Sequence, residues 1–231
     1  MIYVCVDGRR MEYVRKYLNA KNVLDRQKFS EGDILVLPLR WKKCLEDKKI
    51  NISHLKNILI FLPYNHDQLK QNNRLFCYME DCGLLNLNAK LTALGILNKL
   101  SDKGISFFNL NVDIIGHGYC AKEMAKLFDY LNIKYRLIYY KKIENGILNS
   151  EYKKKGNMII NTAPICILNE NDINLYNVDY IIDISSEKCM KKLQGKIASQ
   201  IIFPGSLPEL YYSSDAAYLI ANFVWRNLHE R

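Results

Sequence analysis

Short apolar runs separated by polar or amphipathic stretches occupy the first third of the chain. The runs MIYVCV, DILVLPL and NILIFLP have the composition of buried strands, RLFCYM that of a short fourth strand, and residues 11–19 the spacing of a helix. Continuous Val, Ile and Leu runs are typical of parallel strands that are covered on both faces. The pattern therefore predicts a small, open α/β lobe.

The remaining two thirds begin with a helical pattern and then alternate more regularly. Apolar positions recur at helical spacing from Asn86, which predicts a long amphipathic helix leading into a second lobe. The expected strands are NVDIIG, KYRLIYY, NMIINTAP, DYIIDIS and SQIIFPGS, with a helix at 119–132 and a last helix at 213–228. Strands separated by helices or crossover-length loops imply parallel pairing. We expect an N-terminal lobe at 1–85, an interlobe helix at 86–104 and a second α/β domain at 105–212.

Composition narrows the function classes. At 231 residues and 49% hydrophobic, the chain has the make-up of a globular protein, and its N-terminal apolar run is too short for a signal peptide or a membrane span, so a cytoplasmic protein is expected. The net charge of +9 is spread along the chain without the interleaved aromatic residues of an RNA-binding sheet, so we expect no nucleic-acid partner. The seven cysteines and four histidines lack metal-site spacing, which predicts reduced thiols and no metal.

A glycine-rich turn is the strongest local signal for chemistry. The turn Gly116-His117-Gly118-Tyr119-Cys120-Ala121 follows an apolar strand and precedes a helix. In a dinucleotide site the first glycine allows the tight turn, the second lets the backbone approach the diphosphate, and a small third residue lets helix and strand pack closely. The diphosphate then sits at the helix N-terminus. We interpret these six residues as cofactor-binding, with a simple tight turn as the alternative.

The position about 20 residues further on indicates which cofactor is used. An Asp or Glu there binds the ribose 2′-hydroxyl of NAD(H). This chain instead has Tyr140, Lys141 and Lys142, with Glu144 nearby. Two cations favour a 2′-phosphate, so NADP(H) is predicted in preference to NAD(H), although solvated loop lysines would give the same pattern.

Polar residues, prolines and glycines end three of the expected strands. In open α/β sheets ligands bind at the carboxyl ends of the strands. The side chains and backbone that we expect to line a shared cofactor crevice are those of Asn161, Thr162, Ala163, Pro164, Asp183, Pro204 and Gly205. No His–Asp or Lys–Asp pair marks a general acid or base. The catalytic candidates are Asn161, which would orient the nicotinamide, and Lys90 or Thr92, which would face the interlobe cleft.

Six segments follow one another from about Tyr78 to the C-terminus: EDCGLLNLNAKLTALGIL, GHGYCAKEMAKLF, NTAPICIL, DYIIDIS, FPGSLPE and SSDAAYLIANFVWRNL. Their order resembles the A-subunit family of dipicolinate synthase. The N-terminal lobe matches that family only in outline. The resemblance implies a Rossmann-type doubly wound parallel sheet plus a smaller, flavodoxin-like α/β lobe onto which the C-terminal helix packs back.

The same resemblance implies a function. It suggests an NADP(H)-dependent oxidoreductase of sporulation, on a branch of the lysine pathway, that oxidises dihydro- or hydroxytetrahydrodipicolinate to dipicolinate. A small dicarboxylate substrate, a flavoprotein-like second subunit and a homo-oligomer are the partners that we expect. Where the family has an Arg-Pro-Gly-Gly stretch, this chain has Ser186-Glu187-Lys188-Cys189. A non-catalytic Rossmann partner of another protein, or a reductase of the shikimate or hydroxyacid type, therefore remain alternatives.

Overall fold

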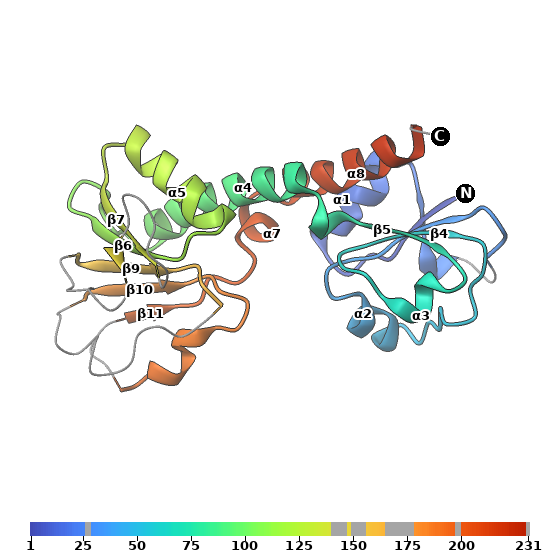
Figure 1. The fold of residues 1–231 in the computed structure, drawn as a ribbon, viewed down its shortest axis with the longest axis horizontal. Helices are drawn as coiled ribbons and strands as arrows, with labels where there is room; N and C mark the ends of the chain where they lie inside the picture. Colours follow the sequence, from blue (N-terminus) through green and yellow to red (C-terminus); the bar gives the residue numbers. More distant parts are fainter. Residues whose placement is uncertain (26–28, 140–146, 149–155, 165–177, 197–199, 230–231) are drawn as a thin grey trace. The chain divides into compact units, whose positions relative to one another are not determined.

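The chain folds into two compact units that both consist of a parallel sheet and helices. The computed structural model describes residues 1–25, 29–139, 147–148, 156–164, 178–196 and 200–229 (Figure 1). The first unit comprises Met1–Asn88 with Tyr211–Arg231, and the second comprises Ala89–Leu210. The boundary between them falls within one long helix, α4 (Cys82–Asp102).

The first unit has a five-stranded parallel sheet. Its elements are β1 (Ile2–Val4), α1 (Arg9–Tyr17), β2 (Lys21–Asn22), η1 (Val23–Asp25), β3 (Ile34–Val36), α2 (Trp41–Asp47), β4 (Leu59–Leu62), α3 (Asp67–Lys70), β5 (Arg74–Cys77), η2 (Tyr78–Glu80) and α8 (Ser213–His229). The strand order is β2-β1-β3-β4-β5, and every pair is parallel. This is the 2-1-3-4-5 order of flavodoxin-like sheets, so the predicted flavodoxin-like lobe is confirmed.

Alternation along the strands gives this sheet two apolar faces. Val36 of β3 packs in one cluster with α1 and α8, whereas its neighbours Leu35 and Leu37 pack in the other cluster with α2. Successive side chains of a strand point to opposite faces, so a continuous apolar run supplies both cores. Helices α1 and α8 lie against each other on one face, and α2 lies on the other (Figure 1). The expected packing of the C-terminal helix on the first lobe is therefore confirmed.

The second unit has a six-stranded parallel sheet. Its elements are the larger part of α4, β6 (Asn111–Ile115), α5 (Tyr119–Tyr130), β7 (Lys134–Tyr139), β8 (Ile147–Leu148), β9 (Met158–Asn161), β10 (Tyr180–Asp183), η4 (Cys189–Leu193), β11 (Gln200–Ile202) and α7 (Leu207–Tyr211), whose last residue belongs to the first unit. The strand order is β11-β10-β9-β6-β7-β8. Counted from β8, this is the Rossmann order 3-2-1-4-5-6. The predicted doubly wound sheet is confirmed.

Both faces of the second sheet bury apolar side chains in their described parts. Ile115, Ile138, Ile159 and Ile181 form one cluster with Met190 of η4. The alternate residues of β6 and β9, among them Val112, Ile114 and Ile160, are fully buried and point to the opposite face. Helices α4 and α5 lie over one face of this sheet (Figure 1).

Close packing explains Gly95 within α4. A Cβ atom placed on Gly95 would lie 2.7 Å from Cβ of Leu207 in α7. Real Cβ atoms essentially never approach so closely, so only glycine allows α7 to sit this near to α4. Gly95 is accordingly a helix-packing residue.

The structure also differs from the sequence-based expectation in detail. The two-residue edge strands β2 and β8 and the short helices α2 and α3 were not predicted, because none is long enough to show a periodic pattern. Helix α4 begins at Cys82, four residues before the expected start. Asp81 explains the earlier start, since its side chain accepts a hydrogen bond from the backbone N–H of Leu84 (2.6 Å).

Candidate functional site

The glycine-rich turn lies at the topological switch point of the second sheet. β6 is the central strand, and the chain leaves it towards β7 on one side and reaches β9 on the other. Ligands of doubly wound sheets bind in the crevice at the carboxyl ends of the two strands that flank such a point. Gly116 follows β6 directly, and Thr162 follows β9 directly. The predicted turn and the predicted strand end are therefore neighbours in space.

Gly116 is required by both its backbone angle and its surroundings. Its φ of +119° lies in the region that side chains rarely adopt. A Cβ atom there would lie 2.2 Å from Oγ1 of Thr162 and 3.3 Å from the backbone nitrogen of Ala163. The Gly116 N–H donates to the carbonyl of Ile138 (3.0 Å), and the Thr162 hydroxyl donates to that of Ile115 (2.9 Å). These contacts hold the carboxyl ends of three strands together.

Gly118 has the opposite environment. It is the N-cap of α5 with φ −75° and ψ −173°, and a Cβ atom there would meet no heavy atom within 4 Å. The first turn of α5 contains no acidic residue. The first N–H groups of a helix have no acceptor within the helix and attract anions. Open space in front of such a helix end fits a diphosphate.

The other residues of the turn differ in how far they are buried. Ala121 is fully buried, as expected for the small residue at which helix and strand approach. Tyr119 is exposed and Cys120 is half-buried. Exposed His117 packs edge-on against Tyr139 of β7, with ring centroids 4.8 Å apart. Burial raises the pKa of the Tyr139 phenol.

The predicted ribose-phosphate residues cannot be placed. Tyr140, Lys141 and Lys142 follow Tyr139 directly but lie outside the described residues. Their assignment stays a prediction from the sequence.

Asn161 and Asp183 lie side by side at the ends of β9 and β10. The Asn161 amide donates to Asp183 Oδ1 (3.0 Å) and to the carbonyl of Ala163 (3.2 Å). Asp183 Oδ1 also accepts from the Ser185 backbone N–H (3.0 Å) and hydroxyl (2.6 Å), and Oδ2 accepts from the Met190 N–H (2.8 Å). Asn161 and Asp183 are buried. Within the described structure the hydrogen bonds of these two side chains therefore fix the ends of β9 and β10 relative to each other.

The remaining strand-end residues are more accessible. Ala163 is half-buried beside the apolar cluster of this sheet, and Pro164 is exposed. Pro204 is half-buried, and Gly205 is exposed with a φ of +74°. Because β11 adjoins β10, these residues lie along the same edge of the sheet as Asp183.

The two candidates on α4 differ in exposure. Lys90 is exposed, whereas Thr92 is buried and its side chain hydrogen-bonds to Cys120. Burial raises the pKa of the Cys120 thiol, and the Thr92 hydrogen bond partly opposes that shift. Thr92 thus connects α4 to the first turn of α5, which follows the glycine turn in sequence.

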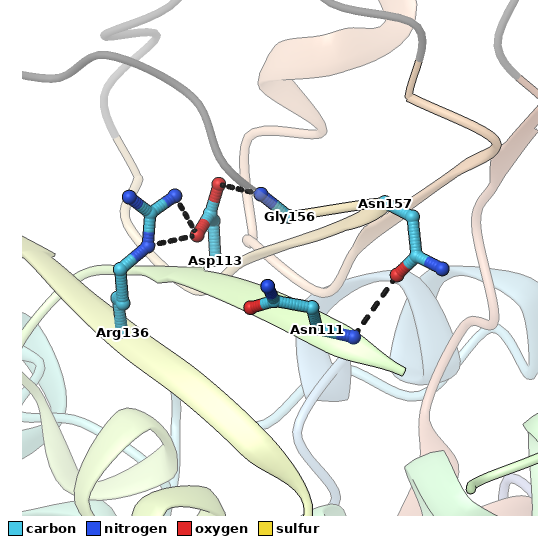
Figure 2. Close-up of polar contacts among 5 residues, drawn as sticks. All are labelled: Asn111, Asp113, Arg136, Gly156 and Asn157. Atoms are coloured by element: carbon cyan, nitrogen blue, oxygen red, sulfur yellow. Dashed lines mark hydrogen bonds and ion pairs between the residues drawn. The ribbon is translucent and has the colours of Figure 1, made fainter. Parts of the chain in front are cut away.

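The sequence did not predict an ion pair between a buried carboxylate and a half-buried arginine. Asp113 of β6 is fully buried, and Oδ1 accepts hydrogen bonds from Nε (2.9 Å) and a terminal nitrogen (2.5 Å) of Arg136 on β7 (Figure 2). Oδ2 faces the N–H of Gly156 (3.4 Å). The available signal was the single acid inside the apolar run NVDII, since a buried charge needs a partner.

Figure 2 also shows how the start of β9 is attached to β6. The Asn157 side chain accepts a hydrogen bond from the backbone N–H of Asn111 (3.0 Å). The amide of Asn157 also donates to the carbonyl of Asn109 (3.0 Å), a residue that the figure does not draw. A Cβ atom on Gly156 would lie 2.4 Å from the Asn111 carbonyl oxygen. These contacts set the position of β9 relative to β6, and therefore that of Thr162 relative to Gly116.

Two structural findings bear on the class of protein. Among the described residues, no group of three or more His, Cys, Asp or Glu side chains could hold a metal ion. No helix in the described ranges combines the length and apolar character needed to cross a membrane.

Comparison with solved structures shows which fold this is. The crystal structure of the dipicolinate synthase A-subunit from Bacillus halodurans matches with a TM-score of 0.76 and 14% sequence identity, over 98% of this chain and 97% of that one. The corresponding dipicolinate synthase chain from Bacillus subtilis matches with a TM-score of 0.73 and 17% identity, over 99% of this chain and 95% of that one. The chain has the fold of the dipicolinate synthase A-subunit. No protein-family model and no curated protein matches the sequence.

Dehydrogenases share the architecture more distantly. A D-isomer-specific 2-hydroxyacid dehydrogenase from Lactobacillus delbrueckii ssp. bulgaricus, in its NAD-complexed form, matches with a TM-score of 0.51 and 12% identity, over 99% of this chain and 97% of that one. An NADPH-dependent glyoxylate/hydroxypyruvate reductase from Sinorhizobium meliloti, in complex with NADP and malonate, also has a TM-score of 0.51, with 13% identity, over 99% of this chain and 92% of that one. Proteins of this fold therefore include both NAD-bound and NADP-bound examples.

Proposed function

We propose that this chain is the nucleotide-binding component of an oxidoreductase that converts a dihydro- or hydroxytetrahydrodipicolinate to dipicolinate with NADP. The glycine turn at the switch point of a Rossmann-ordered sheet is the observation that carries the proposal. The fold shared with the dipicolinate synthase A-subunit over nearly the whole chain supports the choice of reaction.

The residues around the turn fit a dinucleotide. Gly116 closes the turn, open space at Gly118 admits the diphosphate in front of α5, and buried Ala121 brings α5 close to the sheet. Thr162 and the Asn161–Asp183 pair hold the neighbouring strand ends in place. When bound, the nicotinamide supplies the hydride chemistry, and the chain supplies binding and orientation.

The reaction balances with the cofactor alone. Oxidation of a dihydrodipicolinate ring to the aromatic pyridine removes a hydride, which NADP⁺ accepts, and a proton, which leaves to solvent. A hydroxytetrahydro precursor first loses water to give the dihydro ring. Aromatisation favours this direction.

The finer assignments rest on the sequence. Lys141 and Lys142 follow the strand where a 2′-phosphate would lie, which supports NADP(H) in preference to NAD(H). The net charge of +9 and the exposed Lys90 suit a dicarboxylate substrate. A flavoprotein-like second subunit is part of the proposal, because the resemblance to the dipicolinate synthase A-subunit family implies one.

Nucleotide titration tests the cofactor site. Purified protein is titrated with NADPH and NADH, and nucleotide fluorescence reports binding. We expect binding below millimolar concentration with NADPH tighter than NADH, and Gly118→Ala to weaken both. If wild-type protein binds neither nucleotide, the proposal fails.

A second assay tests the reaction. The protein is supplied with freshly generated dihydrodipicolinate precursor and NADP⁺, with and without a candidate flavoprotein-like partner, and dipicolinate is measured by its ultraviolet absorbance. Product that depends on both the chain and NADP⁺ would support the assignment.

A non-catalytic role is the second candidate. The polar atoms of Asn161 and Asp183 are engaged within the protein, as in a site that keeps its architecture without chemistry. Co-purification with a partner protein and no nucleotide binding would favour this role.

A further inference from the structure

Two cysteine sulfur atoms are in close contact inside the first unit. Cys5 follows β1, and Cys44 lies on the buried side of α2. Their Sγ atoms are 2.8 Å apart, and the exposed fractions of the two residues are 0% and 6%. Heavy atoms in van der Waals contact are usually about 3.5–4.0 Å apart. The two thiols are therefore closer than ordinary packing places them.

Backbone hydrogen bonds hold both cysteines where they are. The Cys5 N–H donates to the carbonyl of Val36 (2.9 Å), which continues the pairing of β1 with β3. The Cys44 N–H donates to the carbonyl of Arg40 (3.0 Å) in the first turn of α2. The surrounding side chains are apolar members of one core cluster. The fold thus holds the sulfur atoms as neighbours although 39 positions separate them in sequence.

We propose that Cys5 and Cys44 form a reversible disulfide that links the end of β1 to α2. A disulfide bond is about 2.04 Å long, so the sulfur atoms need to approach by only about 0.8 Å. A peroxide can serve as the oxidant. One sulfur attacks a peroxide oxygen, the O–O bond breaks, and a sulfenic acid and one water form. The second sulfur then displaces the hydroxyl group as a second water, so that two thiols and one hydrogen peroxide give one disulfide and two waters.

Burial determines which cysteine is oxidised first and how fast the disulfide forms. Cys44 is the slightly more exposed residue, so we expect it to meet the oxidant first and Cys5 to resolve the sulfenic acid. Burial raises the pKa of the Cys5 thiol, and the contact with Cys44 raises it further, whereas Lys48 opposes the shift. Few thiolates form at neutral pH, so oxidation is slower than at an exposed cysteine. Once formed, the bond is shielded from reductants in the same way.

Peptide mapping of the full chain tests the proposal. The protein is oxidised with hydrogen peroxide or oxidised glutathione, unfolded, alkylated and digested without reductant. We expect a linked peptide pair containing Cys5 and Cys44, with a mass about 2 Da below the sum of the two reduced peptides. Dithiothreitol should release it. The exposed Cys82 is the internal comparison, because its solvent-accessible thiol should react early without joining this pair.

Variants and unfolding provide the controls. Cys44→Ser should abolish the linked pair, and Cys82→Ser should leave it unchanged. The oxidised wild type should unfold at a midpoint about 5–10 °C higher than the reduced form, because the bond closes a loop of 39 positions. Recovery of both thiols in alkylated form after Cys82 is fully oxidised would overturn the proposal. If Cys44→Ser does not fold, the wild-type map still decides.

Discussion

Replacing Gly116 with alanine tests whether the turn is built as the structure indicates. The φ of +119° is strained for any residue with a Cβ atom, at a cost of about 1–3 kcal/mol. The new methyl group would also lie 2.2 Å from Oγ1 of Thr162. To relieve that contact, the Thr162 hydroxyl must leave the Ile115 carbonyl, which loses a hydrogen bond worth about 1 kcal/mol. We expect Gly116→Ala to destabilise the second unit by about 3 kcal/mol.

Gly118→Ala is the matched control. Its backbone angles are open to alanine, and a Cβ atom there meets nothing within 4 Å. We expect a loss of less than about 1 kcal/mol, from the weaker helix cap alone. Nucleotide binding should nevertheless fall at least about tenfold, because the methyl group occupies the space assigned to the diphosphate. The two glycines thus separate folding from binding.

The measurement must follow the second unit. Both tryptophans, Trp41 and Trp225, lie in the first unit, so their fluorescence serves as an internal reference. Unfolding of the second unit is followed by circular dichroism or calorimetry, where about 3 kcal/mol corresponds to a shift of roughly 10 °C.

A double-mutant cycle identifies the cause. In Gly116→Ala/Thr162→Ala the clash with Oγ1 is gone, so the combined cost should be about 1 kcal/mol smaller than the sum of the single costs. Additive costs would show that Thr162 is not the contact that excludes a side chain at Gly116. A neutral Gly116→Ala would refute the turn geometry itself.

Three further predictions concern the packing and electrostatics of the units. Arg136→Ala leaves the buried Asp113 carboxylate without its guanidinium and should lower the free energy of unfolding by about 3–5 kcal/mol in chemical denaturation. Arg15→Ala, at the surface ion pair with Glu12, should lower it by less than about 1 kcal/mol. Equal losses would contradict the argument from burial. Gly95→Ala should cost about 1–3 kcal/mol by overpacking against Cβ of Leu207. Leu207→Gly removes that Cβ atom, so the combined cost in the double variant should be smaller than the sum of the two single costs, and additive costs would place the strain elsewhere. Burial and the hydrogen bond to Asp129 raise the pKa of Tyr135 to about 12. The contribution of the Tyr135 phenol to stability is therefore complete below the unfolded value of about 10 and is lost as the pH rises through 12. Ultraviolet titration of wild type and Asp129→Asn should show a lower phenol pKa in the variant.

Local pattern was sufficient for the longer strands, the long helices and the glycine turn. The runs around Val36, Ile60 and Ile160 predict buried strands because a continuous apolar segment can be buried only where both faces of a sheet are covered. Gly116 and Gly118 mark the turn because only their local sequence, between a strand and a helix, is needed to recognise it. The fold class followed from the order of these elements.

Tertiary structure alone decided which residues meet. Asp113 pairs with Arg136 across 23 positions, and Asn161 with Asp183 across 22, because the register of neighbouring strands brings them opposite each other. Register depends on how whole strands pack, which no local window of sequence contains. For the same reason the sequence did not show that the Asn161 amide bonds to Asp183 and Ala163, and its predicted role at the nicotinamide stays a prediction. The sequence by itself determined the strand, turn and helix from Asn111 to Tyr130, and the packing of the strands decided which side chains surround that turn.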